Sequence, residues 1–529
     1  MEDRSGMETL ADVLEHNRRM VPEITALVAG QERISWRELY ERAAALTAHL
    51  RAGGLAPGER VACILPNRPS FCIVYWACAL GGYALVPINP RLRREDLRAI
   101  LADSGAAVLF HMEAAGETDY GAMVEALRPE LPALRQRVLA VDDAALGEAA
   151  VWAQLTSPGG EAAAAPTPVA ADDVFAIVYT SGTTGLPKGA MLTHRNLVVT
   201  ARKTAESLAC TSDDVFLVAV PLYHIFGICP SLLTAAELGA RVVLMETFKA
   251  DAALELCARE RVTVHHGVPT MFVLELASPK LHALDLSSLR TGYIAGAPCP
   301  IDVVRRIRTE LGCNVLIAYG LTETSPTLTA TSFDDDDAIR SETVGRALPG
   351  AEVRVRRDAD NAIAATGEVG ELECRGYGIM KGYWNKPDQT AEVLSSDGWF
   401  KTGDLATIDE RNYVRIVGRK KEMVVRGGYK IYPAEVEGLL YEHPLVRQVA
   451  IVGVEDAVLG ERTVAAVVPA AAVADESAAA EELRAYVRSR LADYKVPDRV
   501  VFLDVLPMTA SGKVQKHLLR GQVSLGRVH

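Results

Sequence analysis

Short apolar runs alternate with amphipathic stretches along most of the chain. Runs of this length, rich in β-branched residues, predict buried strands at 61–65, 84–88, 176–180, 215–220, 241–245, 262–266 and 315–319. Between several of them the apolar positions recur with a helical period, as at 252–259 and at 301–311, where Pro300 stands at the expected start. The alternation of strand and helix predicts an α/β protein built from layers with largely parallel sheet.

One apolar stretch is long enough on paper to cross a bilayer, because the 22 residues from Pro69 to Pro90 carry no charge. Gly81, Gly82 and Asn89 interrupt it, however, and buried α/β cores produce such runs routinely. The pattern therefore predicts a buried helix at 71–80 followed by a strand, and no integral membrane span.

The pattern changes near residue 420. Hairpin-like segments at 405–409, 413–417 and 423–426 lead to a helix at 433–441, and then to strands at 449–454, 464–468 and 500–505 with a helix at 481–491. We therefore expect a large N-terminal domain of layered α/β sheets at 1–417, a hinge at 418–421 and a small, mobile α+β domain at 422–529. Alanine-rich stretches at 144–172 and 470–480 are interpreted as surface connections, and the four aspartates at 334–337 as a solvated loop.

Charge and cysteine content exclude some classes of protein. The net charge is -12, with 56 basic and 68 acidic residues and no basic block, which argues against nucleic acid as a partner. The nine cysteines form no C-x-x-C pair and are expected to be reduced thiols packed as small apolar residues. No signal peptide pattern is visible, so a cytoplasmic location is expected. The protein is expected to be a monomer or a homodimer.

The segment from Tyr179 to Gly189 follows a predicted strand and has the chemistry of a triphosphate cradle. Its glycines permit close backbone approach, and its hydroxyls and Lys188 can donate to phosphate oxygens. Because Pro187 precedes the lysine, the segment is not a Walker loop. The candidate nucleotide-binding residues are Thr180, Ser181, Gly182, Thr183, Thr184, Gly185 and Lys188.

Residues 179–196 resemble the phosphate-binding signature of the adenylate-forming superfamily, which includes acyl-CoA synthetases, aryl-CoA ligases, adenylation domains and luciferases. A second signature is similar at 319–324, and the resemblance continues in order over nearly the whole chain. It implies that Thr322 approaches the α-phosphate of ATP, and that Glu323 with Thr183 holds Mg²⁺. It also places Gly296, Ala297, Pro298, Ala318, Tyr319 and Gly320 around the nucleotide.

The C-terminal part of the chain continues the resemblance. It implies that Asp404 and Arg419 bind the ribose, that Lys421 is the hinge residue, and that Gly427 and Gly428 line the pantetheine tunnel. Near the end, Lys513 matches the lysine that bridges the carboxylate and the α-phosphate.

The resemblance implies a ligase that joins a carboxylic acid to coenzyme A. The acid attacks the α-phosphorus of ATP, pyrophosphate leaves, and the thiol of coenzyme A then displaces AMP from the acyl-adenylate. Lys188, Lys513 and Mg²⁺ would offset the repulsion between the two anions. Since Lys513 serves only the first step and the 427–428 segment the second, the small domain is expected to rotate at Lys421.

The segment 221–227 resembles the family's acyl-pocket lining, with His224 beside the acyl carboxylate. His224 could instead be a core histidine. No aspartate for an amino-acid substrate is present, and the expected apolar lining favours a fatty, alicyclic or aryl acid: Phe226, Gly227, Ile228, Val268, Met271 and Leu321.

Two positions depart from the family pattern, and two related functions stay open. Cys299 stands in the stretch expected to contact adenine and has no assigned role, and Ile317 occupies a position where plant aryl-CoA ligases have glutamine. An enzyme that loads a carrier protein, or a luciferase-like oxygenase, would share the same signatures.

Overall fold

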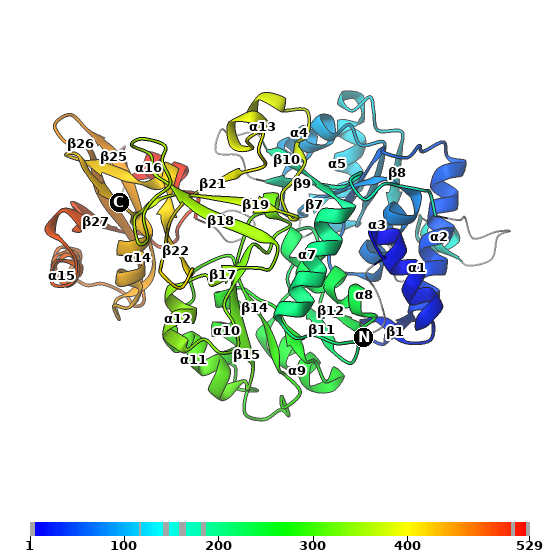
Figure 1. Cartoon of the computed structure of the whole chain (residues 1–529), viewed down its shortest axis with the longest axis horizontal. Coiled ribbons are helices and arrows are strands. Elements are labelled where there is room, and N and C mark those ends of the chain that lie inside the picture. Colours follow the sequence, from blue (N-terminus) through cyan, green and yellow to red (C-terminus); the bar gives the residue numbers. More distant parts are fainter. Residues whose placement is uncertain are drawn as a thin grey trace. The chain divides into compact units, whose positions relative to one another are not determined.

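The computed structural model describes residues 6–115, 118–140, 148–157, 166–180, 187–508 and 514–524. The chain divides into two compact units, one made of Met1–Val353 and Cys374–Phe400 and the other of Arg354–Glu373 and Lys401–His529. Figure 1 gives the course of the chain and the labels of its elements.

The first unit contains a nine-stranded sheet with strand order β17-β16-β15-β14-β13-β11-β12-β1-β2. The strands from β15 to β1 in this order are parallel, and the two edges are antiparallel. The bounds are β1 Thr25–Ala29, β2 Glu32–Ser35, β11 Val215–Val218, β12 Arg241–Leu244, β13 Val264–His265, β14 Thr291–Ile294, β15 Asn314–Tyr319, β16 Thr329–Ala330 and β17 Arg346–Ala347.

A seven-stranded sheet in the same unit has the order β20-β10-β9-β4-β3-β5-β8. It is parallel from β9 to β8, and β10 pairs antiparallel with both β9 and β20. The bounds are β3 Arg60–Ile64, β4 Ala84–Pro87, β5 Val108–His111, β8 Gln136–Leu139, β9 Val174–Thr180, β10 Lys188–Thr193 and β20 Gly382–Tyr383.

The two sheets share a middle layer of helices. One core cluster joins both sheets to α1 Leu10–Met20, α2 Trp36–Ala52, α3 Pro69–Gly81, α7 His194–Ser207 and α8 Thr234–Leu238. A second cluster packs α9 Ala250–Glu260, α10 Pro269–Leu276 and α11 Ile301–Glu310 on the other face of the nine-stranded sheet. A third packs α4 Arg94–Ser104 and α5 Tyr120–Leu127 on the seven-stranded sheet. The unit is thus five layers deep.

The middle layer explains the uncharged stretch. Every residue of α3 is buried, because the helix has sheet or helix on all sides and presents no polar face to solvent. Its left-handed C-cap, Gly82, ends it after 13 residues, well short of a bilayer. In the part of the chain that the structure describes, no helix combines the length and apolar character needed to cross a membrane.

Two stretches interpreted as surface segments turn out otherwise. Residues 148–156 form helix α6 (Glu148–Thr156), and its Trp152 is buried with its ring 6.0 Å from that of Phe110. The alanine content concealed a helix with one apolar face. Within the four aspartates, Asp335 is buried and accepts from the backbone N–H of Ser332, while Asp336 caps α12 (Asp337–Glu342).

A four-stranded sheet has the order β18-β19-β21-β22, formed by Ala351–Arg356, Gly370–Gly376, Phe400–Ile408 and Val414–Arg419. Helix α13 (Pro387–Val393) follows β20, and the short helix η4 (Lys420–Glu422) follows β22.

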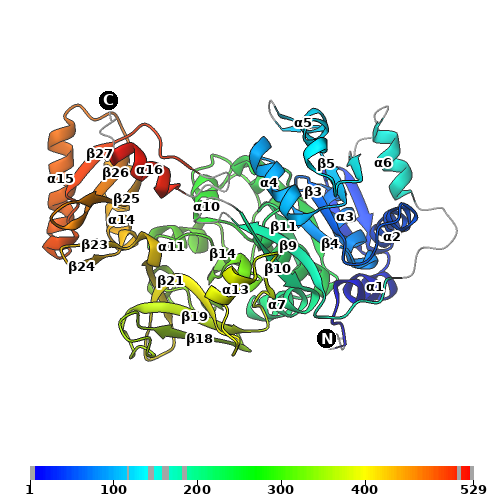
Figure 2. The same ribbon diagram turned by 90° about the horizontal axis from the view of Figure 1, so that it is seen from above.

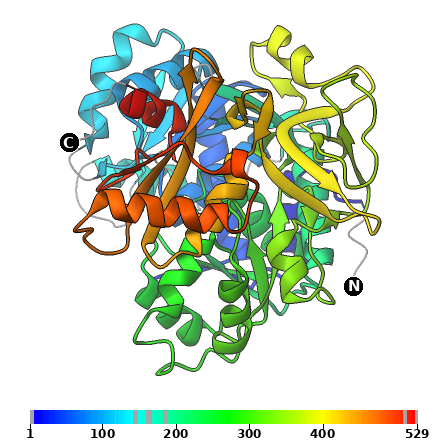
Figure 3. The same ribbon diagram turned by 90° about the vertical axis from the view of Figure 1, so that its left-hand side faces the viewer.

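The rest of the second unit is a five-stranded sheet with helices on both faces. Its strands are β23 Val424–Arg426, β24 Tyr429–Ile431, β25 Val446–Asp456, β26 Gly460–Pro469 and β27 Arg499–Phe502. Side chains alternate along β25, so that Val449 and Ile451 face α14 (Pro433–Tyr441) and α15 (Glu476–Arg488), whereas Ala450 and Val452 face α16 (Lys516–Ser524). Figures 2 and 3 show α15 and α16 on opposite sides of this sheet. The predicted fold class is confirmed, and the hinge at 418–421 stays a prediction.

All nine cysteines are free and eight of them are buried, as expected for packed thiols.

The buried histidine His194 should make stability fall with acidity. Its Nδ1 accepts from the N–H of Leu10 at the start of α1, and burial lowers its pKa from 6.5 to about 4 although Asp173 and Asp12 oppose the shift. Below pH 6.5 the unfolded chain therefore binds a proton at His194 that the folded protein does not bind. The contribution of His194 to the free energy of unfolding should be fully present above pH 6.5 and should fall by on the order of 3 kcal/mol towards pH 4.

Urea unfolding at pH 7 and pH 5 measures this linkage. His194→Gln keeps an acceptor but cannot titrate, so its loss of stability between the two pH values should be smaller than that of the wild type. An equal loss would contradict the assignment to His194.

Candidate functional site

The candidate residues of the first unit gather at one edge of the nine-stranded sheet. Strands β11, β13, β14 and β15 are parallel, so their carboxyl ends meet at the same edge, which is where ligands bind in open α/β sheets. The segments that follow these strands contain, in chain order, His224 to Ile228, Val268 to Met271, Gly296 to Pro298, and Gly320 to Glu323.

A tight turn after β15 holds Thr322 and Glu323. A Cβ at Gly320 would lie 1.4 Å from the carbonyl oxygen of Pro326, so the backbone can pass here only as glycine. The hydroxyl of Thr324 accepts from the N–H of Leu321 at 2.9 Å and donates to the carbonyl oxygen of Pro326 at 3.0 Å. The turn is therefore closed by its own hydrogen bonds, and Thr322 and Glu323 begin the short helix η3 (Thr322–Thr324).

The carboxylate of Glu323 is buried and held by Tyr383. Glu323 is 8% exposed, and its Oε1 accepts a hydrogen bond of 2.9 Å from the phenol of Tyr383 on β20. Burial and the Glu323 carboxylate raise the pKa of Tyr383 well above its usual range, so the phenol remains a donor. The backbone carbonyl of Glu323 also accepts a hydrogen bond from the N–H of Met380 at 2.9 Å, so both the main chain and the side chain of Glu323 are fixed.

Lys188 joins the same group. It stands opposite Thr180 in the β9–β10 pair, so residues 181–187 connect two paired strands. Its Nζ lies 5.1 Å from the centre of the Tyr383 ring, within the range of a cation–π contact. The structure thus brings Lys188, Tyr383 and Glu323 together, and Lys188 and Glu323 are predicted site residues. The other predicted cradle residues lie outside the described residues: Ser181, Gly182, Thr183, Thr184 and Gly185.

Sequence reasoning missed Tyr383. The sequence analysis assigned no role to any side chain of residues 382–384. Nothing in the sequence around Tyr383 marks its phenol as a partner for a carboxylate. Only the β10–β20 pairing, Ala190 with Tyr383, brings that phenol to a carboxylate 60 residues away.

The predicted adenine-contacting segment is exposed at the end of β14. Gly296 has φ of 87°, a left-handed conformation that favours glycine, and Gly296, Ala297 and Pro298 are all exposed. Cys299 turns inward and is buried, and burial raises the pKa of its thiol to about 12. The departure at Cys299 is therefore a packing residue that stays protonated at neutral pH.

The predicted acyl-pocket residues are mostly buried and apolar. Phe226 and Met271 are each 8% exposed and Ile228 is fully buried. Gly227 is required because a Cβ there would lie 2.2 Å from the carbonyl oxygen of Pro221. His224 is exposed, with Nδ1 accepting from the N–H of Phe226 at 3.2 Å, so it is not a core histidine.

In the second unit, Asp404 and Arg419, both predicted to bind the ribose, are paired with each other. They stand opposite each other on β21 and β22, and Arg419 Nε lies 2.8 Å from Oδ1 of the buried Asp404. Lys421 is exposed, two residues beyond Arg419. Gly427 and Gly428 form the exposed turn between β23 and β24, both with positive φ. Lys513 lies outside the described residues.

The donor set suits Mg²⁺ only together with a ligand that brings its own oxygens. Among the described residues no cluster of three or more His, Cys, Asp or Glu side chains could hold a metal ion. Mg²⁺ is commonly held by one or two carboxylates plus substrate phosphates, and Glu323 is a buried carboxylate beside Lys188 and Tyr383. The residues therefore fit such an ion.

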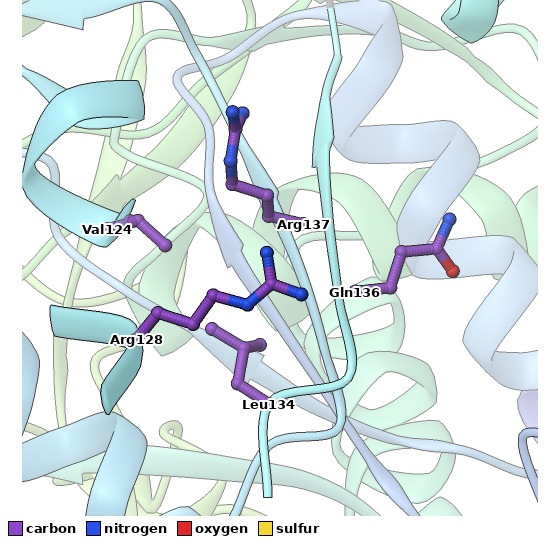
Figure 4. A pocket seen from close by; sticks show the side chains of 5 residues that line it. All are labelled: Val124, Arg128, Leu134, Gln136 and Arg137. Carbon is purple, nitrogen blue, oxygen red and sulfur yellow. The ribbon is translucent and has the colours of Figure 1, made fainter. Parts of the chain in front are cut away.

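A separate hollow is lined by Val124, Arg128, Leu134, Gln136 and Arg137 (Figure 4). It lies by β8, at the opposite end of the seven-stranded sheet from β20 and β10. It holds no predicted site residue.

Comparison with known proteins places the chain in a family. The model of the AMP-binding enzyme family matches residues 14–384, and that of the AMP-binding enzyme C-terminal domain matches residues 435–513. A feruloyl-CoA synthase of an Amycolatopsis species is 40% identical over 95% of this chain and 96% of its own. The human mitochondrial medium-chain acyl-CoA ligase ACSF2 is 32% identical over 98% and 88%. The crystal structure of ATP-bound MatB from Rhodopseudomonas palustris, 30% identical, superimposes with a TM-score of 0.87 over 97% and 99%.

The chain belongs to the AMP-binding enzyme family. Within that family it is an AMP-forming ligase of the acyl-CoA synthetase class, as the motif series indicated.

Gly320→Ala should damage the turn that holds Glu323. The added methyl group cannot occupy space 1.4 Å from a carbonyl oxygen, so the backbone must shift, at a cost of about 1–3 kcal/mol. We expect a lower urea midpoint and a loss of activity greater than the loss of folded protein. Gly438→Ala is the control, because a Cβ there meets no atom within 4 Å. A Gly320→Ala protein with wild-type stability and activity would contradict this geometry.

Proposed function

We propose that this protein activates a carboxylic acid with ATP as an acyl-adenylate and transfers the acyl group to coenzyme A. In the first step the carboxylate oxygen bonds to the α-phosphorus and pyrophosphate leaves. In the second the thiol sulfur bonds to the acyl carbon, AMP leaves, and the thiol proton is released. The observation that carries the proposal is the group of Lys188, Tyr383 and Glu323 at the turn after β15.

Each residue of that group has a defined task. Lys188 donates to phosphate oxygens and offsets their charge where two anions must approach. Glu323 would hold Mg²⁺, which would supply positive charge to offset that of the phosphates. Thr322 donates to the α-phosphate. Tyr383 holds Oε1 of Glu323 and its ring faces the Lys188 ammonium, so it positions both groups before the nucleotide arrives.

The second unit supplies the ribose contact and the residues that change between steps. Asp404 accepts hydrogen bonds from the ribose hydroxyls, and Arg419 fixes its carboxylate. Lys513 bridges the carboxylate and the α-phosphate during adenylation, whereas Gly427 and Gly428 accommodate the pantetheine arm. Lys421 is the hinge about which the chain changes conformation between the two half-reactions.

The acid is fatty, alicyclic or aryl. Phe226, Ile228 and Met271 are apolar and buried, and none could pair with a second charge on the substrate. His224 lies at the exposed start of the segment, where it can hydrogen-bond the acyl carboxylate. A feruloyl-CoA synthase and a medium-chain acyl-CoA ligase among the relatives support this range of acids.

Product analysis by mass spectrometry tests the function. Purified protein is supplied with ATP, Mg²⁺ and coenzyme A and a panel of medium-chain, alicyclic and aryl acids. We expect acyl-CoA, AMP and pyrophosphate in equal amounts for at least one acid. Acyl-AMP that accumulates and transfers only to a holo carrier protein would identify a carrier-loading enzyme, and oxygen-dependent products would identify an oxygenase. Either outcome would refute the proposal.

Removing the hydroxyl of Tyr383 should change the Mg²⁺ requirement. Tyr383→Phe keeps the ring beneath Lys188 but frees the Glu323 carboxylate. By analogy with other groups that orient metal ligands, the Mg²⁺ concentration for half-maximal adenylation should rise roughly tenfold or more. Glu323→Gln should give a larger rise, which added Mg²⁺ partly relieves. Tyr377→Phe is a matched control, because Tyr377 is another phenol with a burial-raised pKa and no bond to Glu323. If neither Tyr383→Phe nor Glu323→Gln changed the Mg²⁺ dependence, the proposal that Glu323 holds Mg²⁺ would be refuted.

Two variants of the second unit should separate the half-reactions in opposite directions. Lys513→Ala should abolish acyl-AMP formation from acid and ATP but largely spare thioester formation from supplied acyl-AMP. Lys421→Pro fixes φ near -65° at the hinge, so it should leave adenylation near normal and impair transfer to coenzyme A. The two half-reactions are measured separately on folded protein. Equal loss of both steps in either variant would contradict the two-step assignment.

A further inference from the structure

Asp103 lies outside every sequence motif. It nevertheless contacts Tyr179 in the predicted phosphate-binding signature and residues 384–386, which follow β20. It stands in the last turn of α4 and is partly buried. Its Oδ2 accepts a hydrogen bond of 2.6 Å from the phenol of Tyr179, and its Oδ1 lies 2.8 Å from Nζ of Lys386. Its backbone carbonyl accepts from the indole of Trp384 at 3.1 Å and from the amide of Asn385 at 3.3 Å.

These contacts reach the strands on both sides of residues 181–186. Tyr179 is the penultimate residue of β9, directly before Thr180. The N–H of Trp384 donates to the carbonyl of Gly189, directly after Lys188, at 2.8 Å. Asp103 therefore ties β9 through the Tyr179 side chain and β10 through Trp384. Since Tyr383 precedes Trp384 and holds Glu323, the same segment also reaches the carboxylate of the turn after β15.

The location of Asp103 is unfavourable unless these partners are present. A carboxylate in the last turn of a helix faces the negative end of the helix dipole, which disfavours it. The Lys386 ammonium and the Tyr179 phenol offset that repulsion. Burial and the Asp103 carboxylate raise the pKa of Tyr179 well above its usual range, so the phenol remains a donor. Arg60 completes the assembly, since it donates to the carbonyls of Ser104 and Gly105 and lies 5.3 Å from the Trp384 ring.

From this geometry we infer that Asp103 is a positioning residue for triphosphate binding, which holds Tyr179 beside Thr180 at the end of β9 and holds Lys386 close to Trp384, which is bonded to β10. The inference rests on the proposed function, in which Lys188 at the start of β10 donates to the phosphate oxygens of ATP. Asp103 does not touch the nucleotide. Its carboxylate acts through Tyr179 and Lys386, whereas its backbone carbonyl holds Trp384 and Asn385, so loss of the carboxylate should weaken triphosphate binding and leave the contacts to the nucleoside intact.

Calorimetric binding of two nucleotides tests the inference. The probes are α,β-methylene ATP with Mg²⁺, whose bridge the reaction cannot cleave, and AMP, which lacks the β- and γ-phosphates. Asp103→Ala should weaken binding of the ATP analogue by about tenfold, by analogy with the loss seen when a group that orients a directly binding residue is removed. Affinity for AMP should stay within about twofold of wild type, because an indirect positioning effect does not reach the ribose contacts.

Three further variants sharpen the test. Asp103→Asn keeps the shape and an acceptor for Tyr179, so it should give a smaller loss. Tyr179→Phe alone should weaken binding of the ATP analogue. The double variant Asp103→Ala with Tyr179→Phe should bind the analogue as tightly as Asp103→Ala alone, because both substitutions remove the same interaction. Asp96→Ala is the matched control. It removes the hydrogen bond that the N–H of Arg93 donates to the Asp96 carboxylate at the start of the same helix, without touching Tyr179 or Lys386.

The outcomes separate this inference from the proposed function. Parallel losses of analogue and AMP affinity in Asp103→Ala, or an equal loss in Asp96→Ala, would mean that Asp103 only stabilises α4 and would overturn the inference. Wild-type affinity for the analogue in Asp103→Ala would also overturn it. If the wild-type protein bound the analogue no better than AMP, the phosphate-binding segment and the proposed function would fail together with the inference. Failure to form acyl-CoA, with the expected split of affinities intact, would refute the proposed function alone.

Discussion

The close approach of the parallel strands β13, β14 and β15 is the constraint on which the candidate site depends. A Cβ at Gly292 would lie 1.8 Å from the carbonyl oxygen of His265, so β14 can pack against β13 only as glycine at this point. The side chains of His265 on β13 and Glu275 on α10 are in contact, with Nε2 and Oε1 2.9 Å apart, and this contact joins the helix to the strand. Because the strands are parallel and in close register, the segments after them converge at one edge. The site is therefore a consequence of strand direction before any of its side chains is considered.

Burial sets the second condition. A carboxylate removed from water must be hydrogen-bonded or paired, and Glu323, at 8% exposure, meets that demand through Tyr383. The same phenol supplies an aromatic face to Lys188. The Tyr383 side chain thus hydrogen-bonds the Glu323 carboxyl group and also contacts the Lys188 ammonium. The described contacts include no direct ion pair between Lys188 and Glu323. Both groups stay available to a third partner that carries its own charge.

The sequence predicted the elements whose pattern is local. Residues 69–81 are apolar on every face and therefore became a fully buried helix, and the seven strands predicted for the first unit lie within a few residues of their predicted bounds, whereas β1, β5, β8 and β14 were not predicted. It failed where composition hid the pattern, as in α6, whose alanines conceal Trp152. The motif residues Lys188 and Glu323 were found because they lie in ordered signatures. Tyr383 and Asp103 were not, because their importance arises from pairings across 60 residues and across 76 residues, which no local spacing records.

That difference separates two kinds of functional residue. Lys188, Thr322 and Glu323 have chemistry that a nucleotide needs, so their types can be recognised from the sequence. Asp103 is a carboxylate at the end of α4 that belongs to no motif, although it binds Tyr179, the first residue of the phosphate-binding signature, and Lys386. What distinguishes them is that α4, β9 and the segment before α13 meet at one point, where a carboxylate can hold a phenol and an ammonium at once. Asp103 bonds to Tyr179, next to Thr180 at the end of β9, so a residue of the signature is held in place by a residue that belongs to no motif.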